Sequence, residues 1–158
     1  MDTSTDLDFM AAALEEAQHA AERGEVPIGA VVVCEGVIVG RGFNLRETSR
    51  DPTAHAEMIA IREASAHLGR WRLIGCTLYV TLEPCPMCMG ALILARIERL
   101  VFGPPDPKGG AAGTLFDLSA DPRLNHSLEV VRGVRADECG LLLSSFFARL
   151  RKEKKARH

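Results

Sequence analysis

The spacing of apolar residues predicts that the chain begins with a helix followed by a hairpin. Apolar side chains recur with the period of one helix face at Met10, Ala13, Leu14, Ala17 and Ala20. Gly24 is placed to end this helix. The next stretch, PIGAVVVCEGVIVGRGF, contains two apolar runs around Glu35-Gly36, which is a hairpin-turn signal.

The rest of the chain alternates helical and strand patterns. Residues 54–68 have apolar positions at helical spacing, and CTLYVTL is a β-branched and aromatic run that predicts a strand ending at Leu82. Pro86 suits the first position of a further helix, which we expect to run to about Ile97. RLVFG and SLEVVRG indicate two short strands, and the apolar positions from Ala136 onward indicate a last helix. Trp71 is expected to be a core side chain at a surface turn.

This order of elements predicts an α/β fold. A hairpin, followed by alternating helices and strands, favours a three-layer α/β/α arrangement with a mixed central sheet of about five strands. Right-handed crossover through the helix that starts at Pro86 makes the flanking strands parallel. A chain of 158 residues is predicted to be a single domain, 1–158.

Composition adds little, but the distribution of charge is informative. Apolar residues make up 47% of the chain and the net charge is −2, so a core is available and the total charge does not indicate a nucleic-acid partner. From about residue 149 the chain becomes basic, with six bases and one acid between Arg149 and Arg157. Such a helix end binds phosphates or an acidic partner, or is simply solvated.

No targeting or membrane segment is expected. The acidic residues Asp2, Asp6 and Asp8 give the N-terminus the wrong charge for a signal peptide. The weakly charged run at 75–95 is interrupted by Glu83 and two prolines, which favours a strand, a turn and a buried helix over a membrane span. We therefore expect a cytoplasmic protein with no membrane partner.

A pair of cysteines in EPCPMC is the first indication of chemistry. Cys85 and Cys88 are three residues apart, so on a helix both sulfurs point the same way. The first turn of a helix favours thiolates, because its N–H groups are unpaired and its dipole is positive there. The pair alone fits two small buried thiols, a thioredoxin-like redox pair or a zinc site.

His55 and Glu57, in the sequence HAE, favour the zinc interpretation. If His55 lies at the start of its helix, its ring can lean past the helix end while Glu57 covers the same end from the other side. Two thiolates and a neutral imidazole balance Zn²⁺, and Cys34, Cys76 and Cys139 lack the context of a fourth ligand. Three protein ligands leave a position for water, which the metal makes more acidic. Glu57 is placed to take the proton of that water.

The two motifs together resemble the signature of zinc-dependent nucleobase deaminases. That signature is His-x-Glu followed by Pro-Cys-x-x-Cys, and it is matched here by residues 55–57 and 84–88. The roles of zinc and of the glutamate are already known for that class. The resemblance therefore implies one Zn²⁺ per subunit held by His55, Cys85 and Cys88, with Glu57 as the proton shuttle.

Longer stretches are similar to the family of bacterial tRNA-specific adenosine deaminases. They are EVPIGAVVV, DPTAHAEMIAIR, LYVTLEPCPMCMGAL, NHSLEVVRG and ADECGLLLSSFF, and the similarity spans about residues 9–151. The resemblance implies a cytidine-deaminase-like fold and hydrolytic deamination of adenosine to inosine at the wobble position of a tRNA anticodon. It also implies a homodimer that binds the anticodon stem-loop.

Further site residues follow from the same resemblance and from residue type. Asn44 and the backbone N–H of Ala56 are implied to hold the flipped base. Lys108 and Arg149 are candidates for phosphate contacts. Phe146 and Phe147 are adjacent, so only one can face the core, and we take Phe147 as a candidate substrate contact. Gly109 and Ala148 depart from the family pattern at two places where RNA contacts are expected.

Two other functions remain open on the sequence. The zinc motif does not specify which nucleobase is deaminated. Deamination of free cytosine, guanine or their nucleosides would therefore use the same catalytic residues. A structural zinc module that binds RNA or protein would need a fourth protein ligand.

Overall fold

The computed structural model describes residues 4–157 and contains one five-stranded sheet with five helices in that range. Asp2 and the outermost residues of the predicted domain 1–158 lie outside the described residues. The elements are α1 (Ser4–Glu22), β1 (Gly29–Cys34), β2 (Val37–Phe43), α2 (Arg46–Ser49), α3 (Ala56–Leu68), β3 (Cys76–Val80), α4 (Pro86–Leu94), β4 (Arg99–Phe102), β5 (Glu129–Val131) and α5 (Ala136–Ala156).

The sheet is mixed, as the sequence predicts. Its strand order is β2-β1-β3-β4-β5. The strands β2, β1 and β3 pair antiparallel, whereas β3, β4 and β5 pair parallel. The parallel pairing of β3 with β4 confirms the crossover expected through the helix that begins at Pro86.

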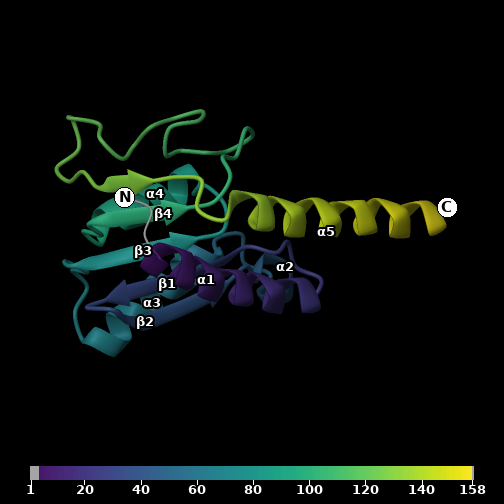
Figure 1. The fold of residues 1–158 in the computed structure, drawn as a ribbon, viewed down its shortest axis with the longest axis horizontal. Coiled ribbons are helices and arrows are strands. Elements are labelled where there is room, and N and C mark those ends of the chain that lie inside the picture. Colours follow the sequence, from purple (N-terminus) through teal and green to yellow (C-terminus); the bar gives the residue numbers. More distant parts are fainter. Residues whose placement is uncertain (1–3, 158) are drawn as a thin grey trace.

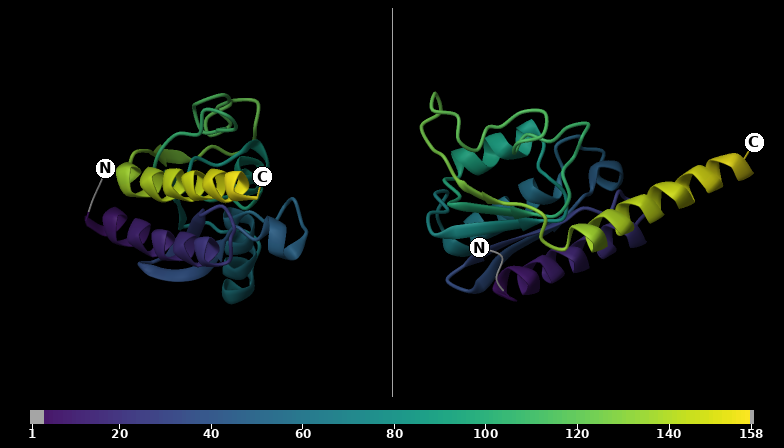
Figure 2. Two further views of the ribbon diagram at one scale, coloured as in Figure 1. Left: turned by 90° about the vertical axis from the view of Figure 1, so that its right-hand side faces the viewer. Right: turned by 45° about the horizontal axis from the view of Figure 1, so that its top comes forward.

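Helices cover both faces of the sheet and complete the three layers (Figures 1 and 2). Alternate residues of β1 divide the core: Ala30 and Val32 pack with α3 and α4, whereas Val31 and Val33 pack with α1 and α5. This period-two alternation is what a strand buried on both faces requires. The far end of α5 extends beyond the sheet (Figure 1).

The hairpin brings α3 close to β2. Glu35 and Gly36 both have positive φ, 51° and 76°, as a type I′ turn needs. Gly40 and Gly42 lie under α3, and a Cβ at either glycine would collide with the helix backbone, at Ala60 and Ala56 respectively. The absence of these two side chains sets the position of the start of α3.

Several boundaries differ from the expectations. The strand expected to reach Leu82 ends at Val80. Thr81 still hydrogen-bonds to Gly29 of β1, through its N–H and its hydroxyl oxygen, and beyond Thr81 the chain turns toward Pro84. The helix expected to reach Ile97 ends at Leu94, since Arg96 adopts the left-handed region with φ 63° and its guanidinium caps the Ile93 carbonyl at 2.7 Å.

Two further features differ from the expectations or were not foreseen. The expectation of a core tryptophan is wrong: Trp71 is 57% exposed, with the Arg72 guanidinium 4.3 Å from its ring centroid. The short helix α2 was not anticipated. No helix within residues 4–157 has the length and apolarity needed to cross a lipid bilayer.

Candidate active site

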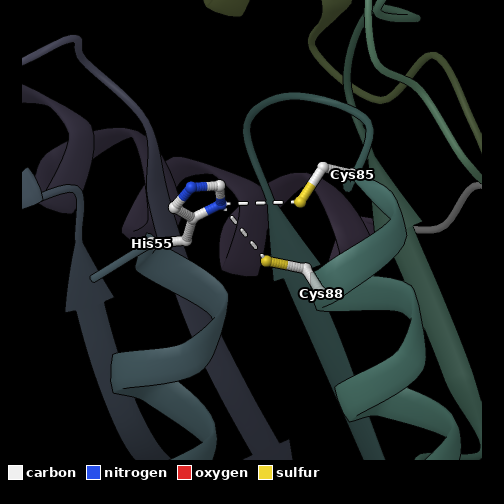
Figure 3. A group of neighbouring side chains, drawn as sticks. All are labelled: His55, Cys85 and Cys88. Carbon is white, nitrogen blue, oxygen red and sulfur yellow. Dashed lines mark hydrogen bonds between the residues drawn. The ribbon is translucent and has the colours of Figure 1, made fainter. Parts of the chain in front are cut away.

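Three potential metal ligands meet where two helices begin (Figure 3). His55 is the N-cap residue of α3, Cys85 is the N-cap residue of α4, and Cys88 lies in the first turn of α4. The Nδ1 atom of His55 lies 3.6 Å from Sγ of Cys85 and 3.5 Å from Sγ of Cys88. The starts of α3 and α4 therefore face each other, and His55, expected at the start of its helix, lies one residue before it.

The donor set fits zinc. The three ligand atoms lie within 4.8 Å of one another, and among the residues described they are the single group of this kind. Zn–S bonds of about 2.3 Å and Zn–N bonds of about 2.05 Å at a tetrahedral angle place N and S about 3.6 Å apart. The observed separations of 3.6 and 3.5 Å match that value. Neither N-cap side chain is engaged in capping its own helix, so both are available to bind a metal.

The protonation of the group also favours a bound cation. The hydrogen bond from Cys88, with that from His55, lowers the pKa of the Cys85 thiol to about 4 despite burial. The hydrogen bond to Cys85 in turn raises the pKa of the His55 imidazole. For Cys88, the same hydrogen bond with Cys85 and burial raise the pKa of the thiol. The two sulfurs compete for one proton, and a divalent ion replaces such protons when it binds.

Glu57 lies beside this group without belonging to it. It is the second residue of α3 and is 4% exposed. Burial, with the negative charge of Cys85, raises the pKa of its carboxyl group to about 7. A carboxylate with such a pKa both accepts and releases protons near neutrality, which is what a general base that later acts as an acid requires.

A pocket of about 600 Å³ opens next to the ligands. His55, Glu57 and Cys85 contribute to its lining. This volume falls within the range that holds a nucleoside-sized ligand. Acid–base and metal-binding groups therefore share one wall of a cavity large enough for a base and its sugar.

Asn44 and Ala56 also line the pocket, as the sequence predicts. Asn44 is 3% exposed and is held by two contacts: its Nδ2 donates to the Val26 carbonyl at 3.2 Å, and its Oδ1 accepts from the Arg46 N–H at 3.2 Å. Ala56 is the first residue of α3, so its N–H has no acceptor within the helix.

The candidate RNA contacts separate into two places. Lys108 and Phe147 line the pocket, and Phe147 is 39% exposed whereas Phe146 is buried at 7%. This confirms that only one of the two phenylalanines faces the core. Arg149 does not line the pocket: it lies in a second depression between the end of α1 and α5, with its guanidinium 6.0 Å from the Phe146 ring centroid.

Several lining residues were not foreseen, among them Glu83 and Arg46, whereas the loop that contains Pro107 and Lys108 was expected to contact RNA. Glu83 directly precedes the Pro-Cys-x-x-Cys motif, and this position could have indicated a residue near the site. Its buried environment could not be predicted in this way, because it depends on a loop more than twenty residues away in the sequence. Arg46 belongs to α2, which the sequence pattern did not indicate.

The fold and this site together define a class of protein. Residues 3–104 match the family described as the cytidine and deoxycytidylate deaminase zinc-binding region. The chain therefore belongs to this deaminase family, and with His55, Cys85 and Cys88 positioned for a metal ion its cofactor is zinc.

Within the family, the chain is most informatively compared with three proteins. It is 59% identical over 148 residues to the tRNA-specific adenosine deaminase of Bacillus subtilis, covering 94% of this chain and 92% of that protein. It superposes with a TM-score of 0.83 and 46% identity on a structure described as a study of A-to-I editing by tRNA:A34 deaminases at the wobble position of transfer RNA, covering 86% of this chain and 99% of the other. A guanine deaminase from Bacillus subtilis is 40% identical with a TM-score of 0.61, covering 72% of this chain and 71% of the other.

Proposed function

We propose that this protein hydrolytically deaminates adenosine to inosine at the wobble position of a tRNA anticodon. The observation that carries the proposal is a pocket lined by Glu57 and by two of the three metal ligands, His55 and Cys85, in a chain similar over nearly its whole length to tRNA-specific adenosine deaminases.

His55 Nδ1 and the sulfurs of Cys85 and Cys88 would hold one Zn²⁺ per subunit. When bound there, zinc lowers the pKa of a water molecule and stabilises negative charge on the oxygen that adds to the ring. The remaining steps are proton transfers by Glu57. Its carboxylate takes a proton from the water and delivers it to N1 of adenine as the water oxygen adds to C6. Glu57 then passes the second water proton to the exocyclic amine, the C6–N bond breaks, and ammonia leaves.

The other lining residues orient the base. Asn44 is fixed by its contacts to Val26 and Arg46, so its remaining donor and acceptor positions face the pocket in one orientation. The free N–H of Ala56 offers a further donor at the helix end. Phe147 presents an exposed aromatic face and Lys108 a positive charge, which suit an unstacked base and a phosphate.

We further infer that the protein acts as a homodimer in the cytoplasm. Large apolar side chains stand exposed on α4 and on the loop after β4, at Leu94, Leu115 and Phe116. Contiguous apolar side chains mark a surface that another subunit covers, and we infer that these three residues belong to one such surface. Sedimentation of the purified protein at two times the monomer mass supports the dimer, and a monomer at micromolar concentration contradicts it. The substrate proposed here is itself cytoplasmic.

The experiment that tests the function measures inosine in a panel of anticodon stem-loops. The zinc-loaded protein is incubated with stem-loops that have A at the wobble position, with controls that have A at a neighbouring position, and with free adenosine, cytidine and guanine. Inosine confined to the wobble position supports the proposal. Ammonia release from a free base with none from RNA would overturn it in favour of the runner-up, which the likeness to guanine deaminase supports.

A further inference from the structure

Two buried glutamates line the pocket, and only Glu57 has a carboxylate available for chemistry. Glu83 is 2% exposed, and both its oxygens are fully engaged. Its Oε1 accepts the N–H of Asp106 at 2.9 Å and the hydroxyl of Thr114. Its Oε2 accepts the N–H of Ala112 at 2.9 Å and that of Thr114 at 3.2 Å. A carboxylate has about four acceptor positions, so these four donors leave none for a substrate.

Every partner of the Glu83 carboxyl group is a donor: the N–H groups of Asp106, Ala112 and Thr114 and the hydroxyl group of Thr114. Hydrogen bonds to a charged acceptor are roughly twice as strong as neutral ones. Glu83 is therefore a strong fixed acceptor rather than a proton carrier.

All four donors belong to one segment, residues 104–114, which we call the 104–114 loop. This loop forms a wall of the pocket through Pro104, Pro105, Asp106, Pro107 and Lys108. Three of these five residues are prolines, which lack an N–H, so this wall has few backbone donors with which to stabilise itself.

The loop is also shaped to close onto the carboxylate. Gly110 lies directly against Glu83, and a Cβ at that position would collide with the carboxylate. The N–H of Gly110 bonds to the carbonyl of Asp106 at 2.9 Å, which draws the two ends of the turn together over Glu83. The loop thus wraps a single buried acceptor contributed by the segment between β3 and α4.

We propose that Glu83 is a positioning residue that holds the 104–114 loop in the conformation that receives the RNA nucleotide. It acts through Lys108 and the prolines rather than on the reacting atoms. This inference rests on the proposed function, because Lys108 of this loop is proposed there to contact a phosphate of the RNA. Losing Glu83 should therefore weaken RNA binding and leave the chemical step largely intact.

The test uses a graded set of variants of the full-length zinc protein. Glu83→Gln keeps the shape of the side chain but turns an amide NH₂ toward N–H donors. Thr114→Val removes the hydroxyl donor from an exposed residue, and Thr114→Ser restores it. Ser119→Ala is the matched control, because it removes a hydroxyl-to-carboxylate bond of 2.5 Å, to Asp117, that does not involve Glu83.

For each variant we would measure kcat and KM on the stem-loop, zinc content, and hydrogen exchange of peptides covering the 104–114 loop. Binding alone is measured in a Glu57→Gln background, where turnover does not intervene. We expect Glu83→Gln to raise Kd and KM about tenfold or more and Thr114→Val about threefold to fivefold, with kcat changed less than about threefold. Thr114→Ser and Ser119→Ala should stay within about twofold of the parent. Exchange in the loop should rise in parallel with Kd.

The outcomes separate this inference from the proposed function. If the unmutated protein neither binds nor edits the stem-loop, the proposed function fails. Suppose instead that the unmutated protein edits the stem-loop normally. If the Glu83→Gln variant is then folded and zinc-loaded and binds the stem-loop as tightly as the parent, the positioning role is overturned. Should Glu83→Gln fail to fold or lose zinc, Thr114→Val decides: unchanged Kd and unchanged loop exchange in that variant overturn the inference.

Discussion

Three buried glutamates near the pocket differ in the direction of their pKa shifts because their surroundings differ. Glu57 is buried beside negatively charged sulfur, and its pKa rises to about 7. Glu83 and Glu25 are equally buried but accept backbone N–H groups, and the pKa of each lies below its ordinary value. Burial alone therefore does not determine protonation: at Glu83 and Glu25 the hydrogen bonds outweigh burial, whereas at Glu57 burial and the charge of Cys85 outweigh the hydrogen bonds.

At Glu57 we predict a separation of zinc binding from catalysis. Glu57→Gln should retain zinc, because Glu57 is not among the three ligand atoms, and should slow inosine formation by about 10²–10⁴-fold through loss of the proton carrier. The measurements are zinc per chain by mass spectrometry and inosine by chromatography. Glu63→Gln, an exposed glutamate of the same helix, is the control and should be fully active. Normal turnover by Glu57→Gln would refute the role given to this carboxylate.

At Glu25 we predict a pH-dependent contribution to stability. Its carboxylate accepts the N–H of Thr48 at 2.6 Å and that of Glu47 at 3.2 Å. Burial raises the pKa of the Glu25 carboxyl group, but the hydrogen bonds from Thr48 and Glu47 together outweigh burial. The net pKa therefore lies below the ordinary value of 4.5. With a lowered folded-state pKa, the stabilisation is fully present above about pH 5.5 and is lost as the pH falls through the folded value.

The measurement at Glu25 is a difference between two proteins. Thermal midpoints of the parent and of Glu25→Gln are recorded from neutral pH down to acid pH. The parent should have the higher thermal midpoint at neutral pH, and the difference between the two midpoints should become smaller as the pH falls below 4.5. A gap that is constant with pH, or that widens in acid, would contradict the assignment.

At the level of elements, the start of α3 depends on glycines in β2. Gly42 lies under the first turn of α3, where a Cβ would collide with the Ala56 carbonyl and come within 2.8 Å of the Ala60 nitrogen. Neither contact can be relieved by rotating a side chain, because both atoms belong to the backbone. His55 and Glu57 flank Ala56, so a shift of this turn displaces the active site directly.

We therefore predict that Gly42→Ala destabilises the protein and reduces zinc binding. The expected loss is about 1–3 kcal/mol of unfolding free energy, the cost of an overpacked core position. Gly90→Ala is the matched control: it lies within α4 with no atom near its Cβ, so it should raise stability by about 1 kcal/mol. Denaturant titrations and zinc content report both effects. A Gly42→Ala protein with the stability and zinc content of the parent would show that α3 can move without consequence.

The elements themselves were largely predictable, and their ends were not. Helical spacing of apolar residues predicted a helix over 54–68, which the structure has at 56–68, and the β-branched and aromatic run CTLYVTL predicted the strand that the structure has at 76–80. The end of α4 at Leu94 depends on Arg96 adopting positive φ and capping a carbonyl, which no periodic pattern reveals. The helix α2 is too short for any period, and its N–H groups are held by Glu25, a distant residue.

At the scale of the whole molecule, charge is separated from the catalytic centre. The last turns of α5 are exposed and basic, and α5 extends past the sheet (Figure 1). A phosphate backbone is attracted to such a segment without regard to sequence, with an affinity that depends on salt. If RNA binds as proposed, we expect the pocket to select the nucleotide and the end of α5 to add affinity.

We predict that the double variant Lys154→Glu/Lys155→Glu weakens binding of every stem-loop to a similar degree. The salt dependence of log Kd should become shallower by about one unit for each phosphate that is no longer neutralised, while kcat stays unchanged. Fluorescence anisotropy at several salt concentrations gives the slope. Arg62→Glu/Arg123→Glu makes the same change in net charge at exposed positions on α3 and in the loop before β5. An equal effect from both double variants would show that only net charge matters.

The chemistry of the site follows from the sequence alone. The types and spacing of His55, Cys85 and Cys88 specify a zinc-binding donor set, and the resemblance to the deaminase signature adds the proposed role of Glu57 as a proton carrier. How the pocket is built around them depends on the tertiary fold. Phe147 faces the pocket and Arg149 does not because α5 packs through Phe146, and Glu83 became an acceptor because a loop from a later part of the chain folds over it. The physical reason is that ligand identity is a property of a residue, whereas burial and hydrogen-bond partners depend on which distant segments the fold brings together.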